Sequence, residues 1–459
     1  MQIKEDLANE FMKIAELRSL PDHKRLNYGL LIGSLIWHTE KLMGNIKYRA
    51  NIVRSKRESE FSEKKIVVYI PMLSGKFHLR FKLMSEYPFS FCDYKLVESI
   101  IITHEIAVNE VINIEYSGLT YYLFEYIENL VIAIYVAEMT SACWGKEITE
   151  MTISGIFDFF RELSNKHYEG KPPELSVSIL PKKKRRKNSF DPISLNSDLL
   201  DTKKILALFK GHRHLLECDL TDHVKNVRTL KPYPDKLLFT KHPPIYLAPY
   251  EYQPTFDYSQ KEKALVYILN RQGDIMVVLD GALILYRMQG VWRIFSAKNF
   301  VETVAACLSK LNPRESRNII DTFAIYLGML SFSLRNNRAG GLIVVGKRND
   351  IEHLLPKDKY ENKPSDTFYQ NILGGKFLPQ LPVSLLCNAL SLDGATLIDI
   401  DGIIISFGAI LSTRTYKSEK EGARTKAAEY ASRFGIAIKI SEDGPITIYR
   451  KSKKIFQLD

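Results

Sequence analysis

The order of apolar segments after residue 312 constrains the fold of this chain more than any other feature. Ser316–Leu334 repeats apolar side chains at helical spacing, and Leu342–Gly346 is a short continuous apolar run, which is typical of a buried strand. Two further strand patterns, a glycine-led helix and a closing hairpin are expected at Thr396–Ile400, Ile403–Phe407, 422–434 and 437–450. Helices and strands in this order predict an α/β fold with a mixed β-sheet flanked by helices.

Upstream of this block the chain divides into three stretches. Residues 1–180 begin with helical apolar spacing and change to strand patterns from Lys65, so they predict an α+β region. Residues 181–234 contain the basic run Lys182–Lys187 close to Pro and Ser residues, which indicates a linker or an exposed basic loop. Residues 235–312 contain consecutive strand patterns joined by glycine turns, and they predict a small β-rich module.

Composition and charge narrow the class of protein. The chain has 459 residues, of which 45% are hydrophobic and 25% charged, as in globular proteins. The net charge is +11, but Lys182–Lys187 supplies +6 of it and leaves only +5 for the rest of the chain. We therefore do not expect a general nucleic-acid-binding surface, whereas anionic small ligands are compatible with this charge. The basic run resembles a nuclear import signal, but we favour a solvated surface loop.

The cysteines and the hydropathy profile predict a cytoplasmic protein without a membrane partner. The five cysteines are scattered and show no CxxC spacing, which favours free thiols in a reducing compartment. The first residues do not have the pattern of a signal peptide. The most apolar window, Tyr121–Met139, contains three glutamates and is too polar to span a bilayer.

The tripeptide Asp-Gly-Ala occurs twice and indicates a candidate site only at its second position. Asp280–Ala282 lies between two strand patterns, and we interpret it as a hairpin turn. Asp393–Ala395 is followed, about thirty residues later, by Gly422, which opens a basic, alanine-rich helix. A carboxylate can hold a divalent cation, and a cationic helix N-terminus can bind phosphates. Together they supply what a nucleoside triphosphate and its metal ion require.

Four segments in this part of the chain resemble the diadenylate cyclase (DAC) family, whose members make cyclic di-AMP. The family carries Arg-Thr-Gly-Ala-Leu-Ile, Asp-Gly-Ala, Gly-Thr-Arg-His-Arg-Ala-Ala and Ser-Glu-Glu-Thr-Gly in this order. The matching segments here are Arg338–Ile343, Asp393–Ala395, Gly422–Ala428 and Ser441–Gly444. The resemblance covers about residues 316–459, within an expected domain of residues 313–459. The N-terminal part resembles only loosely the sensor regions that are fused to such cyclases.

The resemblance implies a metal-dependent nucleotidyltransferase under the control of an N-terminal sensor region. It would condense two ATP molecules into cyclic di-AMP and release pyrophosphate. Each domain would present one ATP to a second domain that faces it, so self-association would be required for activity. Catalysis would consist of positioning the two nucleotides and neutralising the developing charge.

The residues implied by the resemblance also suit this chemistry. The catalytic residues would be Asp393, Arg424 and Thr425, with Asp393 holding Mg²⁺ or Mn²⁺ and orienting the attacking 3′-hydroxyl. Glu442 or Asp443 would complete the metal shell. Small residues let a ribose and base approach the backbone, while cations and hydroxyls at a helix N-terminus bind phosphates. The implied nucleotide-binding residues are therefore Gly394, Ala395, Gly422, Ala423, Arg424, Thr425, Lys426 and Ser441.

The basic segment departs from the family pattern and leaves two alternatives open. Ala423–Lys426 reads Ala-Arg-Thr-Lys where the family has Thr-Arg-His-Arg, and Leu392 stands where many relatives carry His. A lysine at 426 is a point charge and cannot reproduce the two parallel hydrogen bonds of a guanidinium. The chain could therefore be a catalytically impaired nucleotide-binding sensor module, or a cyclase with altered nucleotide specificity.

Overall fold

A computed structural model of the chain describes its fold over most of the sequence. The described residues are 19–20, 22–43, 47–54, 58–62, 64–72, 76–85, 89–111, 120–167, 173–181, 193–195, 213–219, 223–232, 248–294, 297–355, 373–411 and 422–458. The helical pattern expected before residue 19 and the basic run Lys182–Lys187 lie outside these ranges. Across the described segments, no helix combines the length and the apolar character needed to cross a membrane.

The described residues form three β-sheets with helices packed on them. The helices are α3 (Asp22–Met43), α4 (Phe91–Val111), α5 (Thr120–Trp144), α6 (Glu150–Asn165), α9 (Gln253–Glu262), α10 (Ala297–Leu311), α11 (Arg317–Asn336), α12 (Arg348–Glu352), α14 (Val383–Leu390) and α15 (Ala423–Ala431), with short 3-10 turns η2 (Tyr250–Tyr252) and η3 (Leu378–Gln380). The strands are β1 (Lys47–Val53), β2 (Glu60–Ser62), β3 (Lys65–Met72), β4 (Phe77–Met84), β5 (Leu175–Ile179), β6 (Ile193–Ser194), β7 (His214–Cys218), β8 (His223–Thr229), β9 (Leu265–Leu269), β10 (Ile275–Leu279), β11 (Ala282–Met288), β12 (Val291–Ile294), β13 (Gly341–Gly346), β14 (Ala395–Asp399), β15 (Ile404–Ala409), β16 (Gly435–Ile440), β17 (Ile446–Arg450) and β18 (Lys453–Leu458).

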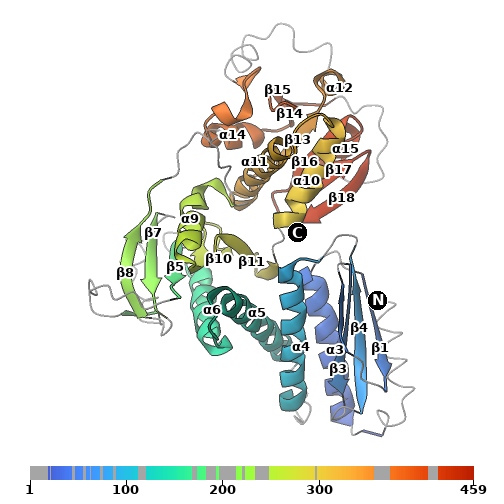
Figure 1. The fold of residues 1–459 in the computed structure, drawn as a ribbon, viewed down its shortest axis with the longest axis vertical. Coiled ribbons are helices and arrows are strands. Elements are labelled where there is room, and N and C mark those ends of the chain that lie inside the picture. Colours follow the sequence, from blue (N-terminus) through green and yellow to red (C-terminus); the bar gives the residue numbers. More distant parts are fainter. Residues whose placement is uncertain are drawn as a thin grey trace.

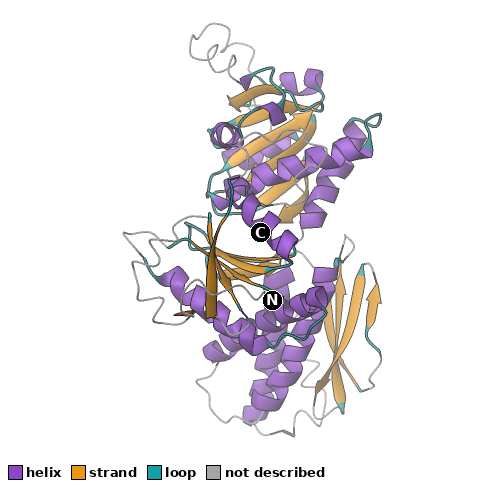
Figure 2. Ribbon diagram, turned by 60° about the vertical axis from the view of Figure 1, so that its left-hand side comes forward, coloured by secondary structure: helices purple, strands orange, loops and turns teal. Residues whose placement is uncertain are grey.

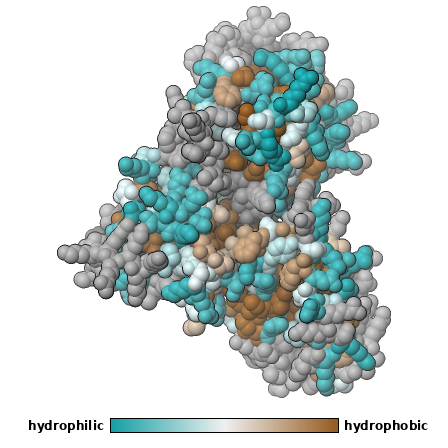
Figure 3. Space-filling model, viewed as in Figure 1, coloured by the Kyte–Doolittle hydropathy of each residue, from teal (hydrophilic) through white to brown (hydrophobic). Residues whose placement is uncertain are grey.

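The N-terminal unit combines helices α3–α6 with an antiparallel sheet of strand order β1-β4-β3-β2. Strands β3 and β4 pair antiparallel with Lys65 opposite Met84, and they begin where the sequence predicts strand patterns. Figure 2 shows the helices lying between this sheet and the next one. On the face shown in Figure 3, hydrophobic residues gather over these helices, whereas the C-terminal unit presents mainly hydrophilic residues.

An eight-stranded sheet lies between the N-terminal and C-terminal units (Figure 1). Its order is β12-β11-β10-β9-β5-β7-β8-β6, with β5 parallel to β7 and the other neighbours antiparallel. This middle sheet therefore crosses the boundaries expected at residues 180 and 234. Residues 214–218 and 223–229 of the expected linker are strands in it, because Leu215 and Leu216 are buried on its two faces.

The two faces of the middle sheet belong to different hydrophobic cores. Tyr267 faces the core of the N-terminal unit, whereas its neighbours Val266 and Ile268 belong to a core shared with the C-terminal unit. Every residue of β9 and β10 is consequently buried. Burial on both faces explains why these strands are continuous apolar runs rather than alternating patterns.

The C-terminal unit is a three-layer α/β arrangement around a sheet of order β15-β14-β13-β16-β17-β18. Strands β13 and β14 are parallel, and the other neighbouring pairs are antiparallel. Ile343 and Val345 point into the core that contains α10, α11 and α14, while Leu342 and Val344 point towards α12 and α15. The mixed sheet flanked by helices that the sequence predicts is thus confirmed, and β18 extends it beyond the expected closing hairpin.

Candidate functional site

Three segments that are distant in the sequence meet at one edge of the C-terminal sheet. Gly340 precedes β13, Asp393 lies just before β14, and Glu442 follows β16. Because β13 and β14 are parallel, their starting ends lie at the same edge. Strand β16 is antiparallel to β13, with Gly341 opposite Ile440, so its final residues return to that edge. The topology therefore brings these segments together.

Arg424, in the first turn of α15, joins the two acidic residues at this edge. Its Nη2 lies 3.6 Å from Oδ1 of Asp393, and its Nη1 lies 3.5 Å from Oε1 of Glu442. The Arg424 side chain is 27% exposed, Glu442 is 71% exposed, and Asp393 is fully exposed. Exposed ion pairs of this kind contribute little to stability. The arrangement instead places two carboxylates and one guanidinium within reach of a ligand from solvent.

Gly340 forms the floor beneath the Arg424 guanidinium. A Cβ atom at this position would overlap Nη1 of Arg424, lie 2.9 Å from its Cζ and lie 3.1 Å from Cγ of Glu442. Any side chain at 340 would consequently displace the guanidinium from its place between the two carboxylates. Steric exclusion of a side chain therefore explains why Gly340, the first residue of the Gly340–Gly341 pair, is a glycine.

The turn that presents Asp393 depends on two glycines with positive φ. Gly394 has a φ of 109° and Gly408, on the neighbouring β15, has a φ of 62°. A Cβ atom on Gly394 would lie 2.6 Å from the carbonyl carbon of Gly408 and 2.8 Å from the carbonyl oxygen of Ala409. These are backbone atoms that cannot move aside, so the turn requires glycine. Ala395 is 1% exposed and lies in the core of the unit, so its side chain does not line a ligand surface.

The residues at the start of α15 differ in their exposure to solvent. Gly422 is the N-cap with a φ of 97°, and its carbonyl oxygen accepts a hydrogen bond from the backbone N–H of Lys426 at 3.1 Å. Ala423 and Lys426 are exposed, whereas Thr425 is half-buried. The Oγ1 atom of Thr425 accepts a hydrogen bond from Nζ of Lys439 at 3.0 Å.

Ser441 and Asp443 belong to the turn between β16 and β17. The backbone N–H of Ser441 donates to the carbonyl oxygen of Pro445 at 2.9 Å, and its own carbonyl oxygen accepts from Gly444 at 3.0 Å. This closed turn directs Glu442 towards Arg424. Asp443 is exposed in the same turn.

The carboxylates at this edge fit a divalent cation only together with a ligand. Among the residues that the structure describes, no three His, Cys, Asp or Glu side chains are grouped to hold a metal ion, so Asp393, Glu442 and Asp443 do not form a complete shell. Mg²⁺ is commonly bound by one or two carboxylates plus substrate phosphates. Asp393 and Glu442, both in contact with the same guanidinium, match that donor set.

The first Asp-Gly-Ala segment is a hairpin turn, as predicted. Asp280 and Gly281 connect β10 to β11, with φ angles of 50° and 76°. Two consecutive positive φ values are typical of a two-residue hairpin turn. The tripeptide therefore adopts two different geometries in one chain, and only the copy at 393 lies beside a cationic helix start.

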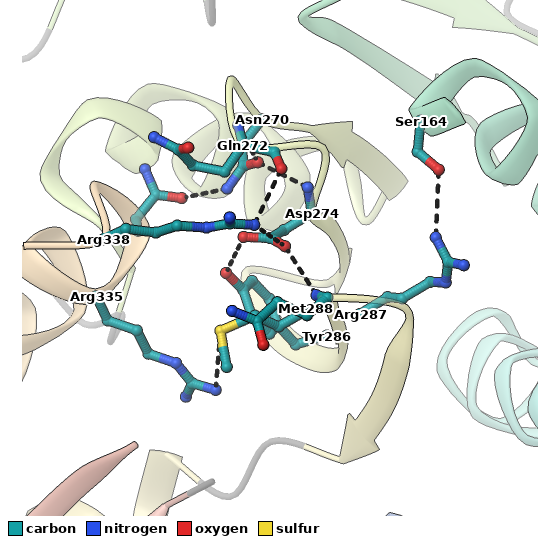
Figure 4. Close-up of polar contacts among 11 residues, drawn as sticks. Ser164, Asn270, Gln272, Asp274, Tyr286, Arg287, Met288, Arg335 and Arg338 are labelled. Carbon is teal, nitrogen blue, oxygen red and sulfur yellow. Dashed lines mark hydrogen bonds and ion pairs between the residues drawn. The ribbon is translucent and has the colours of Figure 1, made fainter. Parts of the chain in front are cut away.

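The loop that leads to Gly340 is held by the middle sheet, as Figure 4 shows. Nη2 of Arg338 donates to the carbonyl oxygen of Gln272 at 3.1 Å and to Oδ1 of Asp274 at 3.3 Å. Asp274 is 1% exposed and also accepts a hydrogen bond from the Tyr286 hydroxyl at 3.3 Å. Burial, and after it the charge of Asp274, raises the pKa of Tyr286, so its phenol keeps the proton that it donates.

The two residues before Arg338 bind the middle part of the chain as well. Oδ1 of Asn336 accepts a hydrogen bond from Nδ2 of Asn270 at 2.8 Å, and Nδ2 of Asn337 donates to Oε1 of Glu251 at 2.8 Å. Three consecutive residues at the end of α11 are thus fixed to the region that includes the middle sheet. The next residues form the floor of the candidate site.

Two features of the site were not predicted from the sequence. Lys439 stands in an apolar strand pattern, where a lone lysine is usually interpreted as facing solvent, yet it reaches Thr425. Arg338 was matched to a family motif, but its hydrogen bonds to Gln272 and Asp274 depend on the packing of two units. The interruption of an apolar run by Lys439 was the one available sequence signal.

Comparison with known proteins gives no assignment. No family model matches this sequence, and no curated protein matches it significantly. The resemblance to diadenylate cyclases therefore rests on four short sequence segments alone.

Proposed function

We propose that residues 313–459 act as a nucleotidyltransferase of the diadenylate cyclase type, which condenses two ATP molecules into cyclic di-AMP. The observation that supports this proposal is the convergence of Asp393, Arg424 and Glu442 above Gly340 at the start of α15. A helix N-terminus with a guanidinium suits phosphates, and the adjacent carboxylates suit a divalent cation.

Each residue of the candidate site would have its own role in binding or catalysis. Arg424 and the free N–H groups at the start of α15 would bind the triphosphate, which competes with the carboxylates for the guanidinium. Asp393 and Glu442 would then hold Mg²⁺ or Mn²⁺ and orient the 3′-hydroxyl. The bound cation would neutralise charge that develops on the phosphates. Each 3′-oxygen would form a bond to the α-phosphorus of the other ATP and lose its proton, while the bond to the pyrophosphate leaving group breaks.

Self-association would supply the second nucleotide, and the surface beside Asp393 supports it. Leu392 is 48% exposed and Ile410 is 70% exposed. Leu392 directly precedes Asp393, and Ile410 follows Ala409, which pairs with Ala395, so both residues belong to the two segments that meet at the Asp393 turn. Large exposed apolar side chains around a polar site suit contact with a second copy that faces it.

Control by the N-terminal part would act through the middle sheet. Arg338 links the loop before Gly340 to Gln272 and Asp274 of that sheet. The opposite face of the sheet packs in the core of the N-terminal unit. A conformational change in the N-terminal unit could therefore be transmitted through the middle sheet and Arg338 to Gly340.

A nucleotide-binding sensor is the second candidate, and one observation favours it. Arg424 contacts both carboxylates that would hold the metal, and Lys426 replaces a guanidinium of the family pattern and is exposed. Such a site could retain a nucleotide without turnover. A cyclase acting on another nucleotide, or on a mixed pair, is consistent with the same departures.

The test compares Asp393→Asn with Asp280→Asn in the full-length protein. Each variant is incubated with ATP and Mn²⁺, and the product is measured by mass spectrometry. We expect wild type and Asp280→Asn to form cyclic di-AMP and Asp393→Asn to form none. Asp280 is a matched control because it is an exposed aspartate that begins the same tripeptide in an ordinary hairpin turn.

Each result separates the candidates. ATP binding without any product would favour the sensor, and product from another nucleotide in a panel of four NTPs would indicate altered specificity. Full activity in Asp393→Asn would contradict the assigned role of this carboxylate.

A further inference from the structure

Lys439 is a cation in an otherwise apolar strand that lies inside the C-terminal sheet. It lies in β16, opposite Leu342 of β13 and Thr447 of β17. Its neighbours Ile438 and Ile440 are fully buried. A lysine in such a strand loses part of the solvent around its stem and around its ammonium group, so its placement requires a physical reason.

The side chain of Lys439 lies on the face of the sheet that α15 covers. Residues two apart in a strand point to the same face. Ala437 packs in the core with Ala428 and Ala431 of α15, so Lys439 also points to the α15 face. It reaches the first turn of the helix, where its Nζ donates to Thr425.

The first turn of α15 therefore brings two cations together. Arg424 lies in this turn, which itself contains no acidic residue, and Lys439 reaches it from β16, while Asp393 and Glu442 contact Arg424 from the neighbouring turns. The positive end of the helix dipole adds to the two cations, and the two carboxylates oppose them. A phosphate that displaces these carboxylates from Arg424 would contact both cations and the helix N-terminus.

Lys426 is less suitable for this role than the sequence implied. Successive helical residues are rotated by about 100°, which puts Lys426 about 200° from Arg424 around the helix. Consistent with this rotation, Lys426 is exposed while Arg424 and Thr425 are half-buried against the sheet.

We propose that Lys439, and not Lys426, is the second phosphate-binding cation of the candidate site. This inference rests on the proposed nucleotide function and adds a residue to it. Lys439 contacts the triphosphate of the bound nucleotide next to Arg424 and exchanges its hydrogen bond with Thr425 for one with a phosphate oxygen. The sheet thus supplies the phosphate contact that the exposed Lys426 does not provide from the helix.

A purely structural role for Lys439, as a tether between β16 and α15, makes a different prediction. Loss of a tether would weaken the binding of every ligand and lower thermal stability. Loss of a phosphate contact would weaken the binding of ATP and leave the binding of adenosine unchanged. The comparison of these two ligands separates the roles.

The experiment measures the Kd of ATP and of adenosine for the full-length protein, with Lys439→Ala and the matched control Lys426→Ala. A hydrogen bond to a charged group corresponds to a loss of about 10–100-fold in affinity when it is removed. We expect that loss for ATP in Lys439→Ala, adenosine binding within about twofold of wild type, and little change in Lys426→Ala. Lys439→Arg should retain most of the ATP affinity.

Lys439→Gln keeps a hydrogen-bond donor but removes the charge, and it serves if the alanine variant does not fold. ATP binding at wild-type affinity in Lys439→Gln, or equal losses for ATP and adenosine, would overturn the proposal. A larger effect of Lys426→Ala would do the same. If the wild-type protein itself does not bind ATP, the proposed function fails before Lys439 is tested.

Discussion

The substitution Gly340→Ala should disturb the candidate site without unfolding the protein. The added Cβ would overlap the end of the Arg424 side chain, which is flexible, and its three nearest neighbours would all be side-chain atoms. The adjacent Gly341→Ala provides the contrast, because its Cβ would lie 2.8 Å from the carbonyl oxygen of Leu390 and 3.1 Å from Cδ1 of Leu334. Neither glycine has a positive φ, so the two variants differ in their neighbours rather than in backbone strain.

The two variants should separate binding from stability. In Gly340→Ala the guanidinium must leave its position between Asp393 and Glu442, and the gain from a stiffer unfolded chain offsets part of the lost contacts. We expect the free energy of unfolding to change by less than about 1 kcal/mol. In Gly341→Ala the backbone must shift, and overpacking of this kind costs about 1–3 kcal/mol.

The assays are guanidinium chloride unfolding and ATP titration, with Gly33→Ala as a control. Gly33 lies in α3, and a Cβ there would meet nothing within 4 Å. We expect ATP affinity to fall by about tenfold or more in Gly340→Ala, as on losing a charged hydrogen bond. Gly33→Ala should bind ATP normally and gain up to about 1 kcal/mol of stability. The reasoning is refuted if Gly340→Ala binds ATP as wild type does, or unfolds as easily as Gly341→Ala.

Three further predictions concern the junction, the N-terminal unit and the exposed apolar residues. Arg338→Met should lower the free energy of unfolding by about 2–4 kcal/mol, because it leaves the buried Asp274 with fewer donors, and adding Asp274→Asn should recover part of that loss in a double-mutant cycle measured by denaturant unfolding. Burial, and after it the charge of His38, lowers the pKa of His104 to about 4. The stabilisation from a neutral His104 should therefore be complete above pH 6.5 and should be lost as the pH falls towards 4, by about 3 kcal/mol in all. Urea unfolding at a series of pH values should show a flatter profile for His104→Leu. Leu392→Asp should reduce self-association and product formation but not ATP affinity, whereas Met151→Asp, at another exposed apolar residue, should leave sedimentation unchanged.

The sequence predicted the C-terminal sheet well because its elements are local. Helical spacing in α11 and short apolar runs in β13, β14 and β16 identify each element without knowledge of its partners. Strand β18 was missed because the turn before it contains no glycine. Lys451 and Ser452 instead adopt positive φ angles of 49° and 60° there, which the residue types do not indicate.

Only part of the middle sheet could be predicted. Its consecutive strands β9–β12 match the β-rich module expected within residues 235–312, whereas the pairing of the earlier strands with them is nonlocal. Strand β5 pairs with β9 across about ninety residues, and local pattern does not specify such a partner. A buried charged residue also makes β7 difficult to recognise from the sequence. Its Glu217 is 3% exposed and accepts hydrogen bonds from Asn226, Arg228 and Tyr258, so a charged residue occupies a strand that is otherwise apolar.

Asp393 lies beside the start of α15, where Arg424 contacts its carboxylate. The position of Lys439 could not be predicted, because it depends on which sheet face α15 covers. The roles of these residues in catalysis stay predictions.

The shared core has a practical consequence for dissecting this protein. Buried side chains from Leu215 to Ile448 form one continuous apolar cluster, which includes strands of the middle sheet and both sides of the residue 312 boundary. A fragment that starts at residue 313 would expose the face of α11 that packs in this core, and it would leave Arg338 without its hydrogen-bond acceptors Gln272 and Asp274. The shortest fragment suitable for crystallisation or assay should therefore begin no later than β5, so that the C-terminal unit keeps the sheet against which it packs.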